Sequence, residues 1–482
     1  VAGSIAPLIF SDNLGEPKFN LDIQERLPVI EALFYARDFN PDDKDESLQT
    51  MYARYDNIES KDLVGELSEA LPHFVYWLMT KVGLIEIATD SDNYAYSIFE
   101  TMNDRGKPLS PVDMLKAYLL APIEDAIERR NANQTWKKQV LDLISWGGIH
   151  ELERDATCIK AWFRAQYADT IRDRKAGATD KDWELIGSAF HRWVRDNCGL
   201  LNLGTQADNL ALISTHFTFF AKAYQYILSA SRTYTPGLEA VFYNAHNEFT
   251  WQNTVLLAPL CVTDDNETMR RKIAATATYL DIWLMRRTVN YIRVGYSSTA
   301  YAMFLLCREI RRKPLNDLVD ILDYRLTNDD VSFNASFARG RVAGIIGLEL
   351  TQFSRRYIYH LLARLTAYVE IGAGKPDLFD KYVDRQQNNP CDIEHIYPNN
   401  YSHYKDQFES EQVFQNWRNA IAGLLLLPAD VNRSYQDKPF EQKAPHYATQ
   451  NLYAASLTPS AYQHQPQFKA FYQQQQLPFT AI

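Results

Sequence analysis

Two stretches near the C-terminal end of the chain decide its fold: CDIEHIYP at residues 391–398 and AGLLLLPADVN at residues 422–432. The first is short and extended in character, and Pro398 closes it because proline has no backbone N–H for a strand ladder. The second begins as an apolar run bounded by glycine and proline, which is typical of a buried strand. Asn432 then begins a polar segment that becomes helical. The pattern predicts the order strand, long loop, strand, helix.

The first stretch carries the residue types that metal-assisted hydrolysis needs. Asp392 and Glu394 stand directly before His395, and Asn432 would add an amide oxygen from the start of the following helix. Carboxylate and amide oxygens suit a hard cation such as Mg²⁺. A histidine that titrates near neutrality suits a base that activates water. A single histidine is more often a buried or capping residue, so only the whole pattern, with Lys443 in the next helix, favours this chemistry.

These residues resemble the ββα-metal (HNH) nuclease fold. They are similar to the version fused behind a ParB/sulfiredoxin-like domain in modification-dependent restriction enzymes of the GmrSD type. DIEHIYP, residues 392–398, matches the first-strand motif of that family, and LLLLPADVNRSYQDKPFEQK, residues 424–443, matches its second strand and Asn-bearing helix. The same first-strand motif occurs in the HNH domain of RNA-guided CRISPR nucleases.

The resemblance implies a role for each residue of the pattern. His395 would be the general base, and Glu394 and Asn432 would bind the metal. Asp392 would be a further ligand or a supporting group, and Lys443 would assist catalysis. The remaining candidate for a supporting or phosphate-contacting group is Arg418.

The sequence departs from the family pattern at one position, and strand geometry limits how two of the candidate residues can share one site. Gly423 stands where the family has the asparagine of Gly-Asn-Leu, although Asn419 lies close by. That asparagine usually fastens a loop, so we expect the substitution to spare the chemistry. Glu394 and His395 are neighbours, and neighbours on a regular strand face opposite ways. Both serve one site only if the strand ends or bulges there.

A second stretch, FETMNDRGKPLSPVDMLKAYLL at residues 99–120, is similar to the second half of the ParB-like domain of the same family. Residues 11–25 fit that domain more loosely. The family's D-G-Q-Q-R motif, which is tied to nucleotide hydrolysis, does not occur in this sequence, so we expect it either before Val1 or lost. By resemblance, a nucleotide site would be lined by Asn103, Arg105 and Gly106. A plain helix-ending turn explains the same three residues equally well.

Helical patterns dominate the rest of the chain. Ser110 is a natural N-cap, followed by Pro111 at the first helical position and Asp113 at the third. Amphipathic patterns rich in Trp, Tyr and Phe extend from about residue 136 to 350, and we expect most of these aromatic rings in the core rather than on a base-stacking surface. A further helix is expected over residues 352–370, with one stripe formed by Phe353, Tyr357, Leu361, Leu365 and Tyr368.

The charge distribution leaves two interpretations open. The formal net charge of −10 taken alone disfavours a nucleic-acid binder. The segment from residue 270 to 364 is the exception, with 16 Lys and Arg against 8 Asp and Glu. This basic segment could contact a nucleic-acid backbone. Alternatively, its arginines lie on solvated helix faces and in ion pairs between domains.

Cysteine usage and hydropathy indicate an intracellular compartment. The five cysteines are widely spaced and form no C-x-x-C, which argues against both a disulfide framework and a thiolate zinc site. No apolar run approaches the roughly 18 residues of a membrane span. No basic segment followed by an apolar one begins the chain. We therefore expect a cytoplasmic protein with reduced, mostly buried thiols.

Together these patterns predict an α+β protein that is mostly α-helical. We expect a partial ParB/sulfiredoxin-like domain at residues 1–130 that senses a nucleotide or a DNA modification, a helical middle region at 131–350, and a ββα-metal HNH domain at 351–482. The resemblance implies a metal-dependent DNA endonuclease or nickase of a bacterial anti-phage, modification-dependent (type IV-like) restriction system.

Cofactors and partners follow from the same resemblance. Mg²⁺ or Mn²⁺ would serve at the HNH domain, and a nucleoside triphosphate would bind at the N-terminal domain. The partner would be DNA, modified phage DNA included, and no membrane. The sequence does not determine the oligomeric state, and a homodimer is one option. Two alternatives stay open: a catalytically degenerate DNA- or nucleotide-binding regulator, and an RNA-directed nuclease, although no RNA-binding module is visible.

Overall fold

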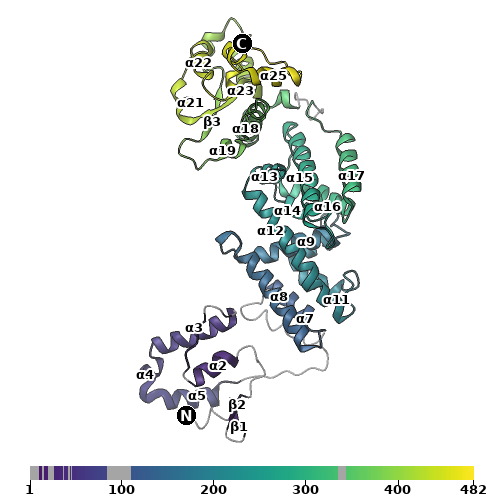
Figure 1. Cartoon of the computed structure of the whole chain (residues 1–482), viewed down its shortest axis with the longest axis vertical. Helices are drawn as coiled ribbons and strands as arrows, with labels where there is room; N and C mark the ends of the chain where they lie inside the picture. The colour runs from purple at the N-terminus through teal and green to yellow at the C-terminus, as the bar shows by residue number, and fades with distance from the viewer. Residues whose placement is uncertain are drawn as a thin grey trace. The chain divides into compact units, whose positions relative to one another are not determined.

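The computed structural model of the chain describes residues 10–13, 16–19, 27–35, 37–41, 44, 46–83, 110–334 and 344–482 (Figure 1). Those residues are mostly α-helical, with 64% helix and 3% strand, as the sequence predicts. The chain divides into two compact units, Val1–Ala95 and Tyr96–Ile482. In the described part, no helix combines the length and the apolar character that a bilayer crossing requires. The five cysteines are unpaired.

The first unit combines a short hairpin with helices. β1 (Phe10–Asn13) pairs antiparallel with β2 (Glu16–Phe19). The helices that follow are α2 (Leu27–Phe34), α3 (Glu46–Ser60), α4 (Leu63–Leu67), η2 (Ser68–Ala70) and α5 (Leu71–Lys81). The candidate nucleotide-binding residues Asn103, Arg105 and Gly106 lie outside the described residues.

The second unit begins its described part with the helix that the sequence marks most clearly. α7 spans Pro111–Leu120, and the Ser110 side chain accepts a hydrogen bond from the backbone N–H of Asp113 at 3.1 Å. The predicted N-cap is therefore confirmed. This bond satisfies one of the four free N–H groups of the first turn, and it directs Leu115 and Leu119 into the core.

A body of helices follows α7: α8 (Ala126–Ile144), η3 (Trp146–Gly148), α9 (Arg154–Tyr167), α10 (Asp182–Asp196), α11 (Gln206–Ala211), η4 (Leu212–Phe217), α12 (Thr218–Arg232), α13 (Glu239–His246), α14 (Gln252–Val255), α15 (Asn266–Val289), α16 (Tyr296–Ile310) and α17 (Leu315–Thr327). Its core is one apolar cluster that includes Trp136, Trp162 and Trp193, each no more than 2% exposed. The prediction that most aromatic rings of this region are buried is therefore confirmed at these positions.

The basic segment uses many of its charges internally. Six of its described cations form ion pairs: Lys272–Asp264, Arg287–Asp329, Arg311–Asp169, Arg325–Glu309, Arg356–Glu248 and Arg364–Asp281. Arg270 and Arg286 donate to backbone carbonyls. At these positions the structure supports the part of the second interpretation that assigns the basic side chains to ion pairs, and these pairs lie within the second unit.

The C-terminal region of the second unit contains a small sheet surrounded by helices (Figure 1). Its elements are η5 (Ile345–Gly347), α18 (Arg355–Gly372), α19 (Phe379–Val383), β3 (Cys391–His395), η6 (Tyr401–Tyr404), α20 (Glu411–Asn419), η7 (Ile421–Gly423), β4 (Leu424–Pro428), α21 (Ala429–Tyr435), α22 (Phe440–Tyr447), α23 (Leu452–Ala455), α24 (Pro459–His464) and α25 (Pro466–Gln474).

The buried face of α18 differs from the stripe that the sequence indicated. Phe353 precedes the helix and is 90% exposed, and Tyr368 is 50% exposed. Leu361 is buried as the stripe predicts, but the buried face also includes Ile358 and Leu362, which lie outside the stripe. α18 packs against β4, α19 and α23. These neighbours decide which arc of an apolar helix is covered, and the helical period alone does not.

A histidine pair, of which His360 is buried and His246 is half-buried, joins the helical body to the C-terminal region within the second unit. His246 on α13 and His360 on α18 place their Nδ1 atoms 3.2 Å apart, and their rings stack with centroids 5.2 Å apart. Burial lowers the pKa of both rings, most strongly that of the fully buried His360. The guanidinium groups of Arg364 and Arg356 lower the pKa of His360 further, whereas Glu248 raises that of His246.

We therefore expect the protein to lose stability as the pH falls below about 6.5, the ordinary histidine pKa. Because the folded-state pKa values are lowered, the unfolded chain binds more protons in this range, so the loss is absent above about pH 7 and grows on acidification. His246→Phe should reduce the slope of unfolding free energy by at most about 1.4 kcal/mol per pH unit, the limit for one proton, which is approached toward the acid end of the range. Thermal unfolding between about pH 7.5 and 5.5 measures this. The exposed His464→Phe serves as control, and equal slopes for wild type and His246→Phe would contradict the expectation.

Candidate active site

The two strands of the C-terminal sheet are antiparallel, with Cys391 opposite Pro428 and His395 opposite Leu424. α21 follows β4 without a gap and carries Asn432. Between the strands lie η6, α20 and η7. The order strand, long loop, strand, helix that the sequence predicts is therefore confirmed.

β4 is buried along its apolar run, and its alternate residues enter two different clusters. Leu424 and Leu426 pack with residues of α18 and α19, whereas Leu425 and Leu427 pack with residues of α21 and α22. A strand covered on both faces has no polar alternation, which explains the unbroken LLLL sequence. The two layers hold the end of β3 in a fixed position.

Glu394 is a buried carboxylate held by a lysine and a tyrosine. Its exposure is 5%, and its Oε1 accepts hydrogen bonds from Lys443 Nζ at 2.7 Å and from Tyr447 Oη at 2.8 Å. Lys443, which is 1% exposed, also donates to the backbone carbonyl of His395 at 2.7 Å. Burial lowers the pKa of Lys443, and the Glu394 carboxylate opposes that effect. The lysine therefore neutralises the buried acid and fixes the end of β3.

His395 is oriented by the last turn of α20. Its Nε2 lies 3.2 Å from Asn419 Oδ1, and Arg418 Nη1 donates to the same oxygen at 3.4 Å. Because this atom accepts from Arg418, it is the oxygen of the amide, and His395 Nε2 must carry the proton that it shares with Asn419. Nδ1 of His395 is then the unprotonated nitrogen.

His395 is held in its neutral form. Burial lowers its pKa to about 4, and the positive charges of Arg418, Lys443 and Arg355 act in the same direction. The hydrogen bond to Asn419 opposes them. A neutral imidazole can accept a proton at Nδ1, but a pKa of about 4 lies below the near-neutral value that the sequence analysis expected of the base.

Glu394 and His395 lie on opposite faces of β3, as strand geometry requires. Glu394 stands opposite Leu425, and His395 stands opposite Leu424 at the last position of the strand. Arg418 interacts with both. It lowers the pKa of His395, while burial lowers its own pKa and the Glu394 carboxylate opposes this. The strand ends at His395, as the sequence analysis required if both residues were to serve one site.

The donor atoms that suit a divalent cation are few. Asn432 Nδ2 donates to the backbone carbonyl of Ile393 at 3.1 Å, which leaves its Oδ1 without a hydrogen-bond donor among the described residues. Glu394 Oε2 likewise receives no hydrogen bond from any described residue. Asp392 is engaged by Arg385 at 3.3 Å and Arg433 at 3.8 Å. The described residues contain no cluster of three or more His, Cys, Asp or Glu side chains suited to a metal.

Gly423 occupies a position with no space for a side chain. A Cβ atom there would lie 2.8 Å from the backbone oxygen of Trp417 and 3.0 Å from that of Arg418. The backbone N–H of Gly423 donates to Ala420 O, so the turn is closed on itself. The last turn of α20, which carries Arg418 and Asn419, therefore approaches this glycine as closely as a backbone allows.

We expect Gly423→Ala to displace the turn that orients His395. Overpacking against backbone typically costs about 1–3 kcal/mol, and the family's asparagine at this position, Gly423→Asn, should cost more because it is larger. Thermal unfolding and a nuclease assay measure the two effects. Gly199→Ala is the matched control, since a Cβ at Gly199 meets nothing within 4 Å. A Gly423→Asn protein with wild-type stability and higher activity would contradict this account.

Two residues of the site were not assigned a role from the sequence. Tyr447 lies four residues after Lys443, so both reach Glu394 from one face of α22. The sequence shows that spacing, but it does not show that this face of α22 lies against the end of β3. Asn419 was noted only as a neighbour of the substituted position, and the structure brings its side chain to His395.

Family models match both ends of the chain. The model described as "GmrSD restriction endonuclease, N-terminal domain" matches residues 8–120, and the model described as "GmrSD restriction endonucleases, C-terminal domain" matches residues 349–465. No curated protein matches the chain. The C-terminal match contains the whole candidate site, and neither model covers residues 121–348. Such domains indicate a phage-defence nuclease that acts on DNA with a divalent metal. Because family models match both its N-terminal and its C-terminal part, the chain belongs to the GmrSD-type restriction endonuclease family.

Proposed function

We propose that the C-terminal region is an HNH-type nuclease domain that cuts or nicks DNA in a modification-dependent restriction system. The observation that carries the proposal is the position of Glu394 and His395 at the end of β3, with Asn432 on the helix that directly follows the paired strand. The strand–strand–helix order and these three residue types together match what HNH chemistry needs. The domain boundaries at residues 130 and 350 remain part of this proposal.

His395 is the proposed general base. Its neutral ring presents Nδ1, because Nε2–H is bonded to Asn419 Oδ1. A water molecule attacking a phosphodiester would lose its proton to Nδ1. The positive charges of Arg418, Lys443 and Arg355 act on His395, which favours an anionic substrate at this end of β3.

Glu394 and Asn432 are the proposed metal ligands, through Oε2 and Oδ1. Both oxygens lack hydrogen-bond donors among the described residues, and both are of the hard type that Mg²⁺ and Mn²⁺ prefer. When bound, the cation would stabilise negative charge on the phosphate and the leaving oxygen. Lys443 and Tyr447 hold the other carboxylate oxygen, so they position Glu394 and supply no ligand. Asp392 is proposed as a supporting group, because two arginines engage it.

The N-terminal domain is the proposed sensor of a DNA modification or of a nucleoside triphosphate, by its family match over residues 8–120. Its candidate contacts remain Asn103, Arg105 and Gly106. A second candidate function, a DNA-binding regulator without catalysis, is favoured by one observation. Glu394 is already neutralised by Lys443 at 2.7 Å, so the site is electrostatically satisfied without a metal.

Plasmid cleavage distinguishes the two functions. The full chain is incubated with supercoiled DNA, unmodified or carrying phage-type base modifications, in Mg²⁺, Mn²⁺ or EDTA. We expect metal-dependent nicking or linearisation that Asn432→Ala reduces strongly and Asn388→Ala, at an exposed asparagine of the adjacent loop, does not. A folded protein that binds both DNAs and cuts neither under any metal condition would favour the regulator.

A further inference from the structure

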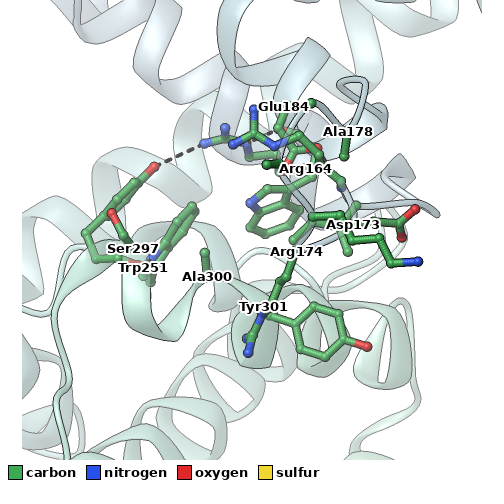
Figure 2. A pocket seen from close by; sticks show the side chains of 16 residues that line it. Arg164, Asp173, Arg174, Ala178, Glu184, Trp251, Ser297, Ala300 and Tyr301 are labelled. Atoms are coloured by element: carbon green, nitrogen blue, oxygen red, sulfur yellow. Dashed lines mark hydrogen bonds between the residues drawn. The ribbon is translucent and has the colours of Figure 1, made fainter.

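The helical body contains a cavity of about 650 Å³ between the loop that joins α9 to α10 and the start of α16 (Figure 2). Its lining includes Arg164, Arg174, Trp251, Tyr296 and Tyr301. A volume of that size falls within the roughly 300–1,000 Å³ range of small-molecule sites. The cavity lies within residues 121–348, which neither family model covers.

The loop over the cavity is fixed at its base. Asp182 Oδ2 accepts hydrogen bonds from the backbone N–H groups of Asp169 and Thr170, at 3.1 and 2.9 Å. Glu184 Oε2 accepts from the backbone N–H groups of Arg172 and Lys181, at 2.9 and 3.3 Å. Two carboxylates at the start of α10 therefore hold both arms of the loop. The exposed tip, residues 173–177, is presented beside the cavity on a rigid base.

The carboxylates that line or border this cavity are already engaged. Asp173 pairs with Lys181 at 3.3 Å, and Asp180 pairs with Arg172 at 2.9 Å. Among the described residues, no carboxylate lies within ion-pair distance of Arg164, Arg174 or Lys175. These three cations are left to attract an anion.

Arg164 is the most firmly placed of the three. Its Nε donates to the backbone carbonyl of Trp183 at 2.8 Å, and its guanidinium lies 5.2 and 5.4 Å from the ring centroids of Trp183 and Trp251. Gly187 on α10 makes the space for it, because a Cβ there would lie 2.0 Å from Nη2. Nη1 donates to the Tyr296 hydroxyl at 3.3 Å.

Aromatic rings form the other half of the lining. Tyr296 stacks on Trp251 with centroids 4.1 Å apart and planes 8° apart. Trp251 is buried, but Tyr296 is 53% exposed and Tyr301 is 42% exposed. Figure 2 shows Arg174 beside Tyr301, with its guanidinium 4.9 Å from the ring centroid. Exposed rings beside guanidinium groups that have no carboxylate partner form the combination on which proteins stack bases and bind phosphates.

We propose that this cavity binds a nucleotide unit, with its phosphate at Arg174 and Lys175 and its base against the exposed rings of Tyr296 and Tyr301. A simple anion would use the cations but not the rings, and an apolar ligand would use the rings but leave the cations buried without partners. The nucleotide could belong to a DNA strand or be free in solution. The site contains no residue of the candidate active site, so binding here does not depend on cleavage.

Binding is tested in EDTA, where no cleavage occurs, by fluorescence anisotropy of the full chain with a labelled single-stranded DNA of twelve nucleotides. Arg174→Ala/Lys175→Ala should weaken binding about 10-fold and lower the slope of log K against log salt by about 1.4, as expected for two lost phosphate contacts. Lys138→Ala/Arg271→Ala removes two exposed charges elsewhere in the helical body and is the matched control. An equal loss in both double variants would overturn the proposal.

Variants of Tyr301 test whether a base stacks on the exposed rings. Tyr301→Ala should lower affinity about 10-fold, as base–aromatic stacking predicts, whereas Tyr301→Phe should retain it because the ring remains. Tyr324→Ala on α17, at a residue that is 68% exposed, is the matched control. In a second measurement, DNA containing 5-iodouracil is photo-cross-linked and the adduct is mapped. Adducts at Tyr296 or Tyr301 support the site, and adducts found exclusively elsewhere would overturn it.

Calorimetric titration with deoxycytidine monophosphate separates the two sources of the nucleotide. Binding of the monophosphate that is lost in Arg174→Ala/Lys175→Ala identifies a site for free nucleotides. If the pocket variants weaken binding of the twelve-nucleotide DNA and the monophosphate does not bind at the cavity, the site is one for a DNA strand. If neither ligand responds to the pocket variants, the cavity is not a nucleotide site, and the proposed nuclease function is unaffected.

Discussion

DNA cleavage by His395→Ala is expected to fall by about 10²–10⁴-fold, the usual contribution of a general base. In the wild-type protein the Nε2 proton is held by Asn419 Oδ1, so the neutral ring offers Nδ1 to the attacking water. Alanine removes the imidazole nitrogen that is proposed to accept the proton at the end of β3. The measurement is the rate of plasmid nicking in Mg²⁺ or Mn²⁺ with enzyme in excess.

The fold of His395→Ala is expected to survive. The ring is only half-buried, and Asn419 Oδ1 keeps its hydrogen bond from Arg418, so the loss of stability should be about 1 kcal/mol. His403→Ala, at an exposed histidine on η6, is the matched control and should cut at the wild-type rate. Cleavage by folded His395→Ala at the wild-type rate would remove His395 from the mechanism and, with it, the HNH assignment.

The largest loss of stability is expected for Lys443→Met. Methionine keeps the length of the side chain but removes its charge, which leaves the Glu394 carboxylate buried with Tyr447 as its remaining donor. It also frees the carbonyl of His395. Removing one partner of a buried ion pair typically costs about 3–5 kcal/mol. Thermal and denaturant unfolding should both report this loss, and cleavage should fall because Glu394 and the end of β3 are no longer fixed.

A double-mutant cycle shows whether the loss arises from the pair. Lys443→Met/Glu394→Gln should be more stable than Lys443→Met alone, because the uncompensated charge is gone. Lys469→Met, at an exposed lysine of α25, is the matched control and should change stability by less than about 0.5 kcal/mol. A loss below about 1 kcal/mol in Lys443→Met would contradict the role of Lys443 as the partner of a buried charge.

Much of the local structure was predictable because its causes are local. The Ser110 cap depends on residues three apart, and the α7 helix begins where the cap places it. The LLLL run and Pro398 mark the two strands of the sheet, and the structure has β3 and β4 where the sequence places them. Glu394, His395 and Asn432 could be chosen as candidates because the motif orders them along the chain.

The arrangement around those candidates was not predictable from the motif. Lys443 and Tyr447 reach Glu394 across 49 and 53 residues, and Asn419 reaches His395 across 24. The stripe of α18 and the use of the basic segment in internal ion pairs depend likewise on partners distant in sequence.

By itself, the sequence determined the family of this protein, the order of its C-terminal strands and helix, and the residue types of its candidate site. Only the tertiary structure decided that Asn419 takes up the contact with His395 while Gly423 leaves room for the α20 turn, and that Arg164 and the rings of α16 border one cavity. The reason is that capping and strand formation depend on neighbouring residues, whereas charge neutralisation, side-chain orientation and cavity formation depend on which distant surfaces the packed core brings together.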